Sequence, residues 1–110
     1  MIRVDVIRTS GREEVHEVPP GIAAIRAIHT LLSRETVDVV NVRDGRLMVV
    51  DDEAWESETV VHPGGAIELV ARTPRKPINV KATALYRAVT MPNDHQIAVD
   101  VAIVFDADLA

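Results

Sequence analysis

The sequence of 110 residues contains no cysteine and few aromatic residues. Without cysteine the chain forms no disulfide and no thiolate metal site, and it has no cysteine nucleophile. Trp55, Tyr86 and Phe105 are the single members of their kinds, so the core has to be built from Val, Ile, Leu and Ala. Because β-branched side chains suit a pleated sheet better than a helix, this composition favours a sheet-rich domain.

Long apolar runs and a positive net charge are also missing. No run approaches the ~20 residues of a membrane span, and the N-terminus lacks the pattern of a signal peptide. The formal net charge of −5 has the wrong sign for a protein that coats nucleic acid. The 47% of hydrophobic residues suffices to offset the chain entropy lost on folding. We therefore expect one domain, residues 1–110, in the cytoplasm and not in a membrane.

The N-terminal segment predicts a β-hairpin. Apolar and polar residues alternate over Ile2–Ile7, and a polar turn with Gly11 follows. Glu13–Val18 is the returning strand, polar enough for a sheet edge, and Pro19-Pro20 ends it.

A helix and a second hairpin come next. Apolar residues recur at helical spacing over Ile22–Ser33, and we expect Ile25, Ile28 and Leu32 to be buried against the sheet. Val37–Val42 and Leu47–Val50 are strands joined by Asp44-Gly45, a strong hairpin signal.

The second half contains shorter elements. Asp51–Glu58 is predicted as an acidic loop, Thr59–His62 and Ala66–Arg72 as strands, and Thr73–Pro77 as a loop. Asn79 is a candidate N-cap for a helix over Lys81–Ala88.

The last segment decides the fold class. The apolar run Ile97–Phe105 predicts a central strand. The whole pattern predicts an α+β fold: a mixed or mainly antiparallel sheet with the Ile22–Ser33 helix on one face, β-grasp-like in its N-terminal half.

Catalytic and metal-binding patterns are not found in the sequence. His16, His29, His62 and His95 fall on four different segments, and none has the spacing of a zinc site. We expect His29 to be partly buried and bonded through one ring nitrogen. Phosphate-loop, dinucleotide and nucleophile-elbow patterns are missing as well. We therefore expect no enzyme activity, no metal and no cofactor.

The acidic segment is the first candidate for binding. Trp55 stands among carboxylates and either packs on the sheet or anchors a protein partner. The candidate protein-binding residues are Trp55, Asp51, Asp52, Glu53, Glu56 and Glu58.

The basic segment that follows is the alternative. From Leu69 to Asn93 the chain carries five basic residues and no acidic one. Arg72, Arg75, Lys76 and Lys81 are the candidates for contact with nucleic-acid phosphates.

Several segments together resemble a known family. They are Val37–Val42, Asp51-Asp52-Glu53, Lys76–Asn79 with Ala82–Tyr86, and Ile97–Val104. In these segments the chain is similar to a small family of uncharacterised domains common in bacteriophage and mobile-element genes. The closing strand of that family reads Ile-Ala-Gly, and Val99 occupies the glycine position here.

The resemblance implies a context and no site residues, because the family has no assigned activity. It implies a phage-type accessory protein that acts in the cytoplasm of a bacterial host cell. Together with the missing catalytic patterns, it leads us to expect a non-catalytic binding protein whose partner is a host protein. Nucleic-acid binding is the alternative, and the oligomeric state stays open.

Overall fold

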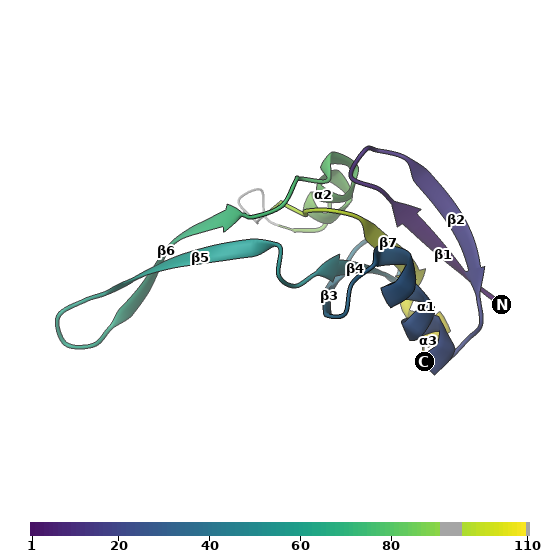
Figure 1. Ribbon diagram of the computed structural model, residues 1–110, viewed down its shortest axis with the longest axis horizontal. Helices are drawn as coiled ribbons and strands as arrows, with labels where there is room; N and C mark the ends of the chain where they lie inside the picture. The colour runs from purple at the N-terminus through teal and green to yellow at the C-terminus, as the bar shows by residue number, and fades with distance from the viewer. Residues whose placement is uncertain (91–95, 110) are drawn as a thin grey trace.

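Seven strands and three helices make up the part of the chain that the structure, a computed structural model, describes (Figure 1). It describes residues 1–90 and 96–109, with the backbone alone at 55–58 and 70–74. The large sheet contains β1 (Ile2–Ile7), β2 (Glu13–Val18), β3 (Val37–Asn41), β4 (Arg46–Asp51) and β7 (Val101–Phe105). The helices are α1 (Ile22–Leu32), α2 (Val80–Arg87) and α3 (Asp106–Leu109), and a separate ribbon contains β5 (Trp55–Val61) and β6 (Ile67–Pro74).

The large sheet is antiparallel, with the strand order β2-β1-β7-β4-β3. This confirms the predicted α+β class. The strand, strand, helix, strand, strand order of the N-terminal half is present, and β7 lies between its two hairpins. Strands β2 and β3 are the two edges, as the polar sequence of β2 predicts.

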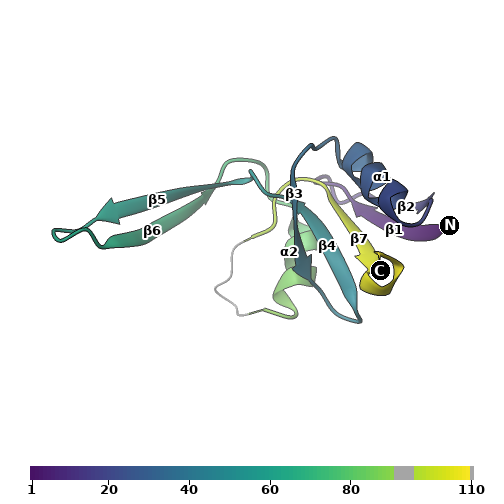
Figure 2. The same cartoon turned by 90° about the horizontal axis from the view of Figure 1, so that it is seen from below.

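One face of the sheet is covered by α1 (Figure 2). The helix begins after Gly21, at φ 74°, and ends at Ser33, whose left-handed backbone (φ 53°) stops it. Ile28 and Leu32 are buried against Val4 and neighbouring strand residues, as predicted. Ile25 differs, because it lies at the margin of the helix–sheet contact and 46% of it is exposed.

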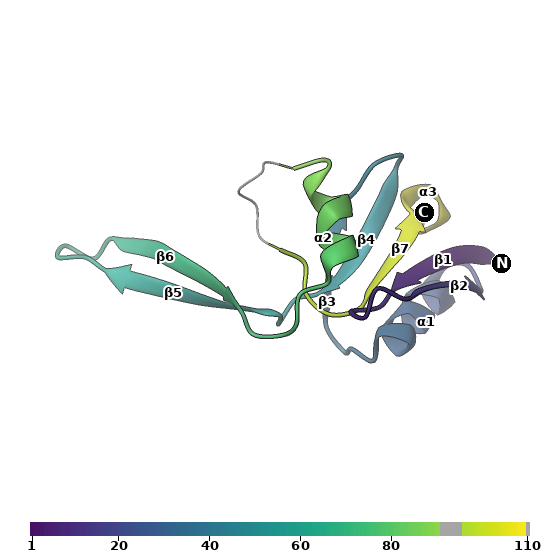
Figure 3. The ribbon, with the colours of Figure 1, turned by 90° about the horizontal axis from the view of Figure 1, so that it is seen from above.

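The other face is covered at one end by α2 (Figure 3). Asn79 caps this helix as predicted, since its Oδ1 accepts a hydrogen bond from the Ala82 N–H. The buried Asn79 side chain also donates to the carbonyls of Ile7 and Val99, each at 2.9 Å. One amide thereby joins α2 to β1 and to the segment that leads into β7.

The predicted start of the closing strand is wrong. β7 begins at Val101, because residues 97–99 bond to the segment before α2 instead of to the sheet. The Asn79 N–H donates to the Ile97 carbonyl and the Val99 N–H to the Pro77 carbonyl. Val99 has a positive φ of 54°, which turns the chain before it enters the sheet.

The predicted loops at residues 51–58 and 73–77 are also partly wrong. Residues 55–58 belong to β5 and pair with 71–74 of β6, so the two short predicted strands form one longer ribbon. We call this ribbon, residues 55–74, the arm. It projects away from the large sheet and gives the molecule extents of 55 × 26 × 24 Å (Figure 1).

Candidate protein-binding surfaces

The arm has one apolar and one mixed face. Thr59 pairs with Leu69 and Val61 with Ile67, so these four side chains share a face. Val61, Ile67 and Leu69 are 67%, 70% and 55% exposed. Figure 1 shows the ribbon extending beyond the layers formed by the sheet and its helices. These three side chains each keep more than half of their surface exposed, so among the described residues no other part of the chain covers them.

The opposite face of the arm carries a hydrogen-bonded pair, His62 and Glu68. His62 Nε2 lies 2.6 Å from a carboxylate oxygen of Glu68. Val60, which pairs with Glu68, shares this face and is 43% exposed. Val60 and Val61 are therefore neighbours in sequence on opposite faces of the same ribbon.

A cluster of charges holds the root of the arm. The Asp51 side chain at the end of β4 is 2% exposed and pairs with Lys76, which follows β6, and with Arg34 at 3.2 Å. Burial raises the pKa of Asp51, but the hydrogen bonds from Lys76 and the Glu53 N–H and the nearby positive charges bring it below its ordinary value. The cluster fixes the point where the arm leaves the body.

The predicted acidic surface is divided by this arrangement. Asp51 is buried at the arm root, whereas Asp52 and Glu53 are exposed in the turn that follows. Trp55, Glu56 and Glu58 belong to β5, and their side chains lie outside the described residues. Their predicted contact with a protein partner stays a prediction.

The predicted basic surface is divided too. Lys76 is held by Asp51, and Lys81 donates to the Gly11 carbonyl at 2.7 Å and lies 3.4 Å from Glu13. Arg75 is exposed, and the Arg72 side chain lies outside the described residues. Two of the four cations therefore face protein carboxylates.

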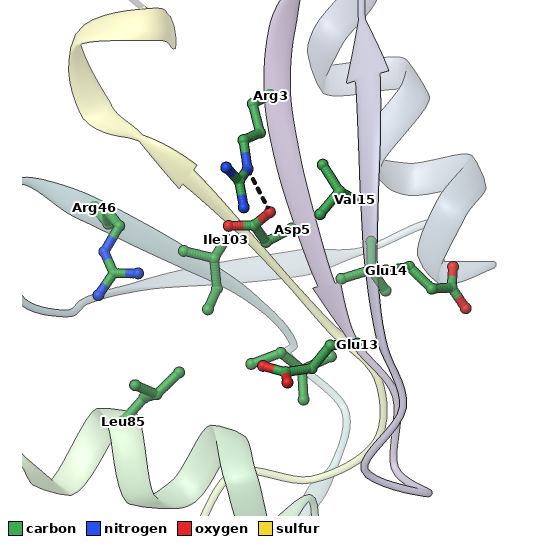
Figure 4. Close-up of a pocket in the computed structure, with 10 residues that line it drawn as sticks. Arg3, Asp5, Glu13, Glu14, Val15, Arg46, Leu85 and Ile103 are labelled. Carbon is green, nitrogen blue, oxygen red and sulfur yellow. Dashed lines mark hydrogen bonds and ion pairs between the residues drawn. The ribbon is translucent and has the colours of Figure 1, made fainter.

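A hollow of about 370 Å³ lies on the face of the sheet that α2 covers only in part. Figure 4 shows Arg3 paired with Asp5, Arg46 beyond Ile103, and Leu85 of α2 below the opening. Its lining charges have both signs, and Asp5 is already paired at 2.8 Å. The hollow therefore does not point to one class of ligand.

Sequence reasoning missed a second charge network, which ties the first hairpin to α1 and β7. Arg8 makes two hydrogen bonds of 3.0 Å to Glu14, one to Asp100 and one to the carbonyl of Leu31. The bonds from Arg8 and His16 lower the pKa of Glu14 to about 2. No local pattern signals this network, because its members come from four separate segments.

The three described histidines, His16, His29 and His62, each have one hydrogen-bond partner within the chain. His29 Nδ1 lies 2.9 Å from the Arg34 carbonyl, which confirms the predicted single ring bond. His16 pairs with Glu14, and His95 lies outside the described residues. Within residues 1–90 and 96–109, no three potential metal ligands come together.

No family model, curated protein or solved structure matches this chain. Among the described helices, none is long and apolar enough to cross a membrane.

Proposed function

We propose that this protein is a non-catalytic binding protein that holds a protein partner through its arm. The observation that carries the proposal is the exposed apolar face formed by Val61, Ile67 and Leu69. A lone two-stranded ribbon is marginally stable in water, and exposed contiguous apolar side chains mark interaction surfaces. A partner that covers this face stabilises the ribbon and gains affinity from the same contact.

The free energy gained by burying the apolar face of the arm is that of a small interface. Full burial of a Val, Leu or Ile side chain contributes about 1.5–3 kcal/mol, so covering the exposed part of these three residues supplies roughly 3–6 kcal/mol. Association consumes part of this gain through lost rigid-body freedom. The exposed Asp52 and Glu53 at the arm root add steering towards a basic partner surface.

The resemblance to the phage and mobile-element family supports a host protein as the partner, in a bacterial cytoplasm. That family has glycine at the position of Val99, and the left-handed backbone of Val99 is the conformation that glycine adopts most easily. The residue departs from the family here, but the backbone has the conformation that a glycine would suit, and this supports the proposal that the chain is a relative.

Nucleic-acid binding by Arg72, Arg75, Lys76 and Lys81 is the alternative. It is less favoured because Lys76 and Lys81 already face carboxylates and the net charge is −5. Digestion of a lysate with nuclease before capture separates the two functions.

The test compares two neighbouring valines. Wild type, Val61→Asp and Val60→Asp are immobilised, and proteins retained from a nuclease-treated bacterial lysate are quantified by mass spectrometry. We expect a specific retained protein whose amount falls at least tenfold with Val61→Asp and less than twofold with Val60→Asp. Both positions are exposed, and circular dichroism checks that both variants remain folded, since Val60→Asp places a carboxylate opposite Glu68.

Equal retention by all three proteins would show that the apolar face of the arm is not the binding surface. Capture from untreated lysate is run in parallel, and a protein retained only from the untreated lysate would favour the nucleic-acid alternative.

A further inference from the structure

The outer edge of the large sheet at β3 offers backbone groups that pair with no other strand. The Val42 N–H donates to the Arg46 carbonyl at 3.1 Å, which sets the alternation of hydrogen bonds between β3 and β4. Counting back along β3, the backbone groups of residues 37, 39 and 41 point away from β4. The Val39 N–H accordingly takes the carboxylate of its neighbour Asp38 as acceptor, at 2.8 Å.

An apolar pocket lies directly beside this edge. It has a volume of about 150 Å³ and is lined by Ile25, Ile28 and His29 of α1, by Val37 and Val39 of β3, and by Val49 and Leu109. Ile25 and Val39 are each 46% exposed, so the pocket opens to solvent between the helix and the strand. The partial exposure of Ile25 makes this helix residue part of the pocket wall.

The surroundings of the pocket are acidic. Asp38 lies on the edge strand, Glu35 precedes it, and Asp106 and Asp108 stand beside Leu109 in α3. Arg34 is held by Asp51 at the arm root, and the exposed Arg26 follows Ile25 on α1, so the four carboxylates outnumber these two cations. Charge complementarity therefore favours a partner with basic residues next to its apolar ones.

We propose that the β3 edge binds an extended segment of a partner protein as a sixth strand. The segment carries apolar residues at alternate positions, one of which enters the pocket, and basic residues at its ends. Backbone hydrogen bonds to Val37, Val39 and Asn41 supply affinity, and the pocket supplies specificity. This site lies on the sheet and does not depend on the arm.

The opposite edge of the sheet serves as an internal comparison. The Arg8 N–H donates to the Arg12 carbonyl, so by the same alternation Val15 of β2 also has outward backbone groups. Val15 borders the hollow of mixed charge described above, whereas Val39 borders the apolar pocket. The same substitution at Val39 and at Val15 thus removes an outward N–H at each edge. Only the N–H of Val39 lies beside the apolar pocket described above.

The probe is a set of labelled synthetic peptides, Lys-x-Thr-x-Thr-x-Lys with blocked ends, in which x is Val, Ile, Leu or Phe. Binding is measured by fluorescence anisotropy to wild type, Val39→Pro and Val15→Pro. Proline removes the donor and is tolerated at a sheet edge. We expect at least one peptide to bind wild type, with affinity lowered at least tenfold by Val39→Pro and less than twofold by Val15→Pro.

Two further variants keep the test decisive if Val39→Pro unfolds. Ile25→Asp places a charge in the wall of the pocket on the partly exposed side of α1, and we expect the same tenfold loss. Val61→Asp changes only the arm and should leave peptide binding within twofold of wild type. Failure of the arm proposal and failure of the edge proposal can therefore be distinguished. Circular dichroism reports whether each variant is folded.

Three outcomes would overturn this proposal. One is that no peptide binds wild type with a dissociation constant below about 1 mM. Another is equal loss of binding with Val39→Pro and Val15→Pro. The third is a wild-type dimer in sedimentation that Val39→Pro converts to monomer, because a second copy of the chain would then occupy the edge.

Discussion

The backbone of Val99 lies in the left-handed region at φ 54°, while its side chain is buried. An L-residue in this region loses roughly 1–2 kcal/mol, and a β-branched residue is rarely found there. The conformation persists because its N–H bonds to the Pro77 carbonyl and its carbonyl accepts from the buried Asn79 amide. Strain at one residue is thus offset by hydrogen bonds that orient the segment entering β7.

Two substitutions at Val99 test this strain. Both Val99→Ala and Val99→Gly remove the branched side chain, but only glycine escapes the penalty of a positive φ. We expect Val99→Gly to be more stable than Val99→Ala by about 1 kcal/mol in urea unfolding. At Val15, in a regular strand, the order should reverse, because glycine weakens a strand relative to alanine. A more stable alanine variant at both sites would contradict the assigned backbone conformation.

Glu14 gives a prediction for the dependence of stability on pH. Its pKa falls from 4.5 to about 2 on folding, through the bonds from Arg8 and His16. Since the folded pKa is the lower one, its contribution to stability is fully present above pH 4.5 and is lost as the pH falls towards 2. Thermal midpoints measured between pH 7 and pH 2.5 should fall less steeply for Glu14→Gln than for wild type. Glu17→Gln removes an exposed carboxylate from the same strand and should keep the wild-type slope.

At the scale of the element, α1 carries two kinds of isoleucine. Ile28 is 3% exposed in the core, whereas Ile25 is 46% exposed at the rim of the apolar pocket. We expect Ile28→Ala to cost ~2–5 kcal/mol through lost burial and the cavity it leaves. Ile25→Ala should cost less than about 1.5 kcal/mol. Chemical unfolding of both variants checks the order, and equal losses would mean that the helix is rotated from its assigned face.

Most elements could be predicted because their signals are local. The alternation in β1, the period of α1, the Asp44-Gly45 turn and the Asn79 cap each depend on neighbours within a few residues. The start of β7 could not be predicted. The apolar run has the same residue pattern whether its first residues pair with the sheet or bond to the segment at Pro77.

The candidate sites were less predictable for a related reason. Asp51 and Asp52 are adjacent aspartates that the sequence does not distinguish. Only Asp51 is buried, because Arg34 and Lys76 reach it from distant parts of the chain. Similarly, the apolar pocket needs Ile25, Val39 and Leu109 together, which the topology decides. The alternation of Ile67 and Leu69 places both on one face of a strand, but it does not reveal that the arm projects from the body.

At the scale of the molecule, the shape follows from two separate sheets. The Cα radius of gyration is 15.6 Å, whereas a compact domain of this length has about 13 Å. The excess arises because the arm forms its own two-stranded sheet. The edge pocket of the body and the apolar face of the arm are therefore the two separate surfaces on which we propose that partners bind.

If the arm is an appendage of a self-sufficient body, it can be shortened without unfolding the protein. The Arg75 N–H bonds to the Ala54 carbonyl at 2.8 Å, so replacing residues 55–74 by an Asn-Gly turn keeps the root closed. Ala54 is 1% exposed and Asp51 still meets Lys76, so the buried contacts at the root remain. We expect the thermal midpoint to change by only a few degrees and the radius of gyration from X-ray scattering to fall to about 12 Å. Loss of cooperative unfolding in this variant would show that the arm contributes to the core. An unchanged radius would show that, in solution, the arm folds back along the body.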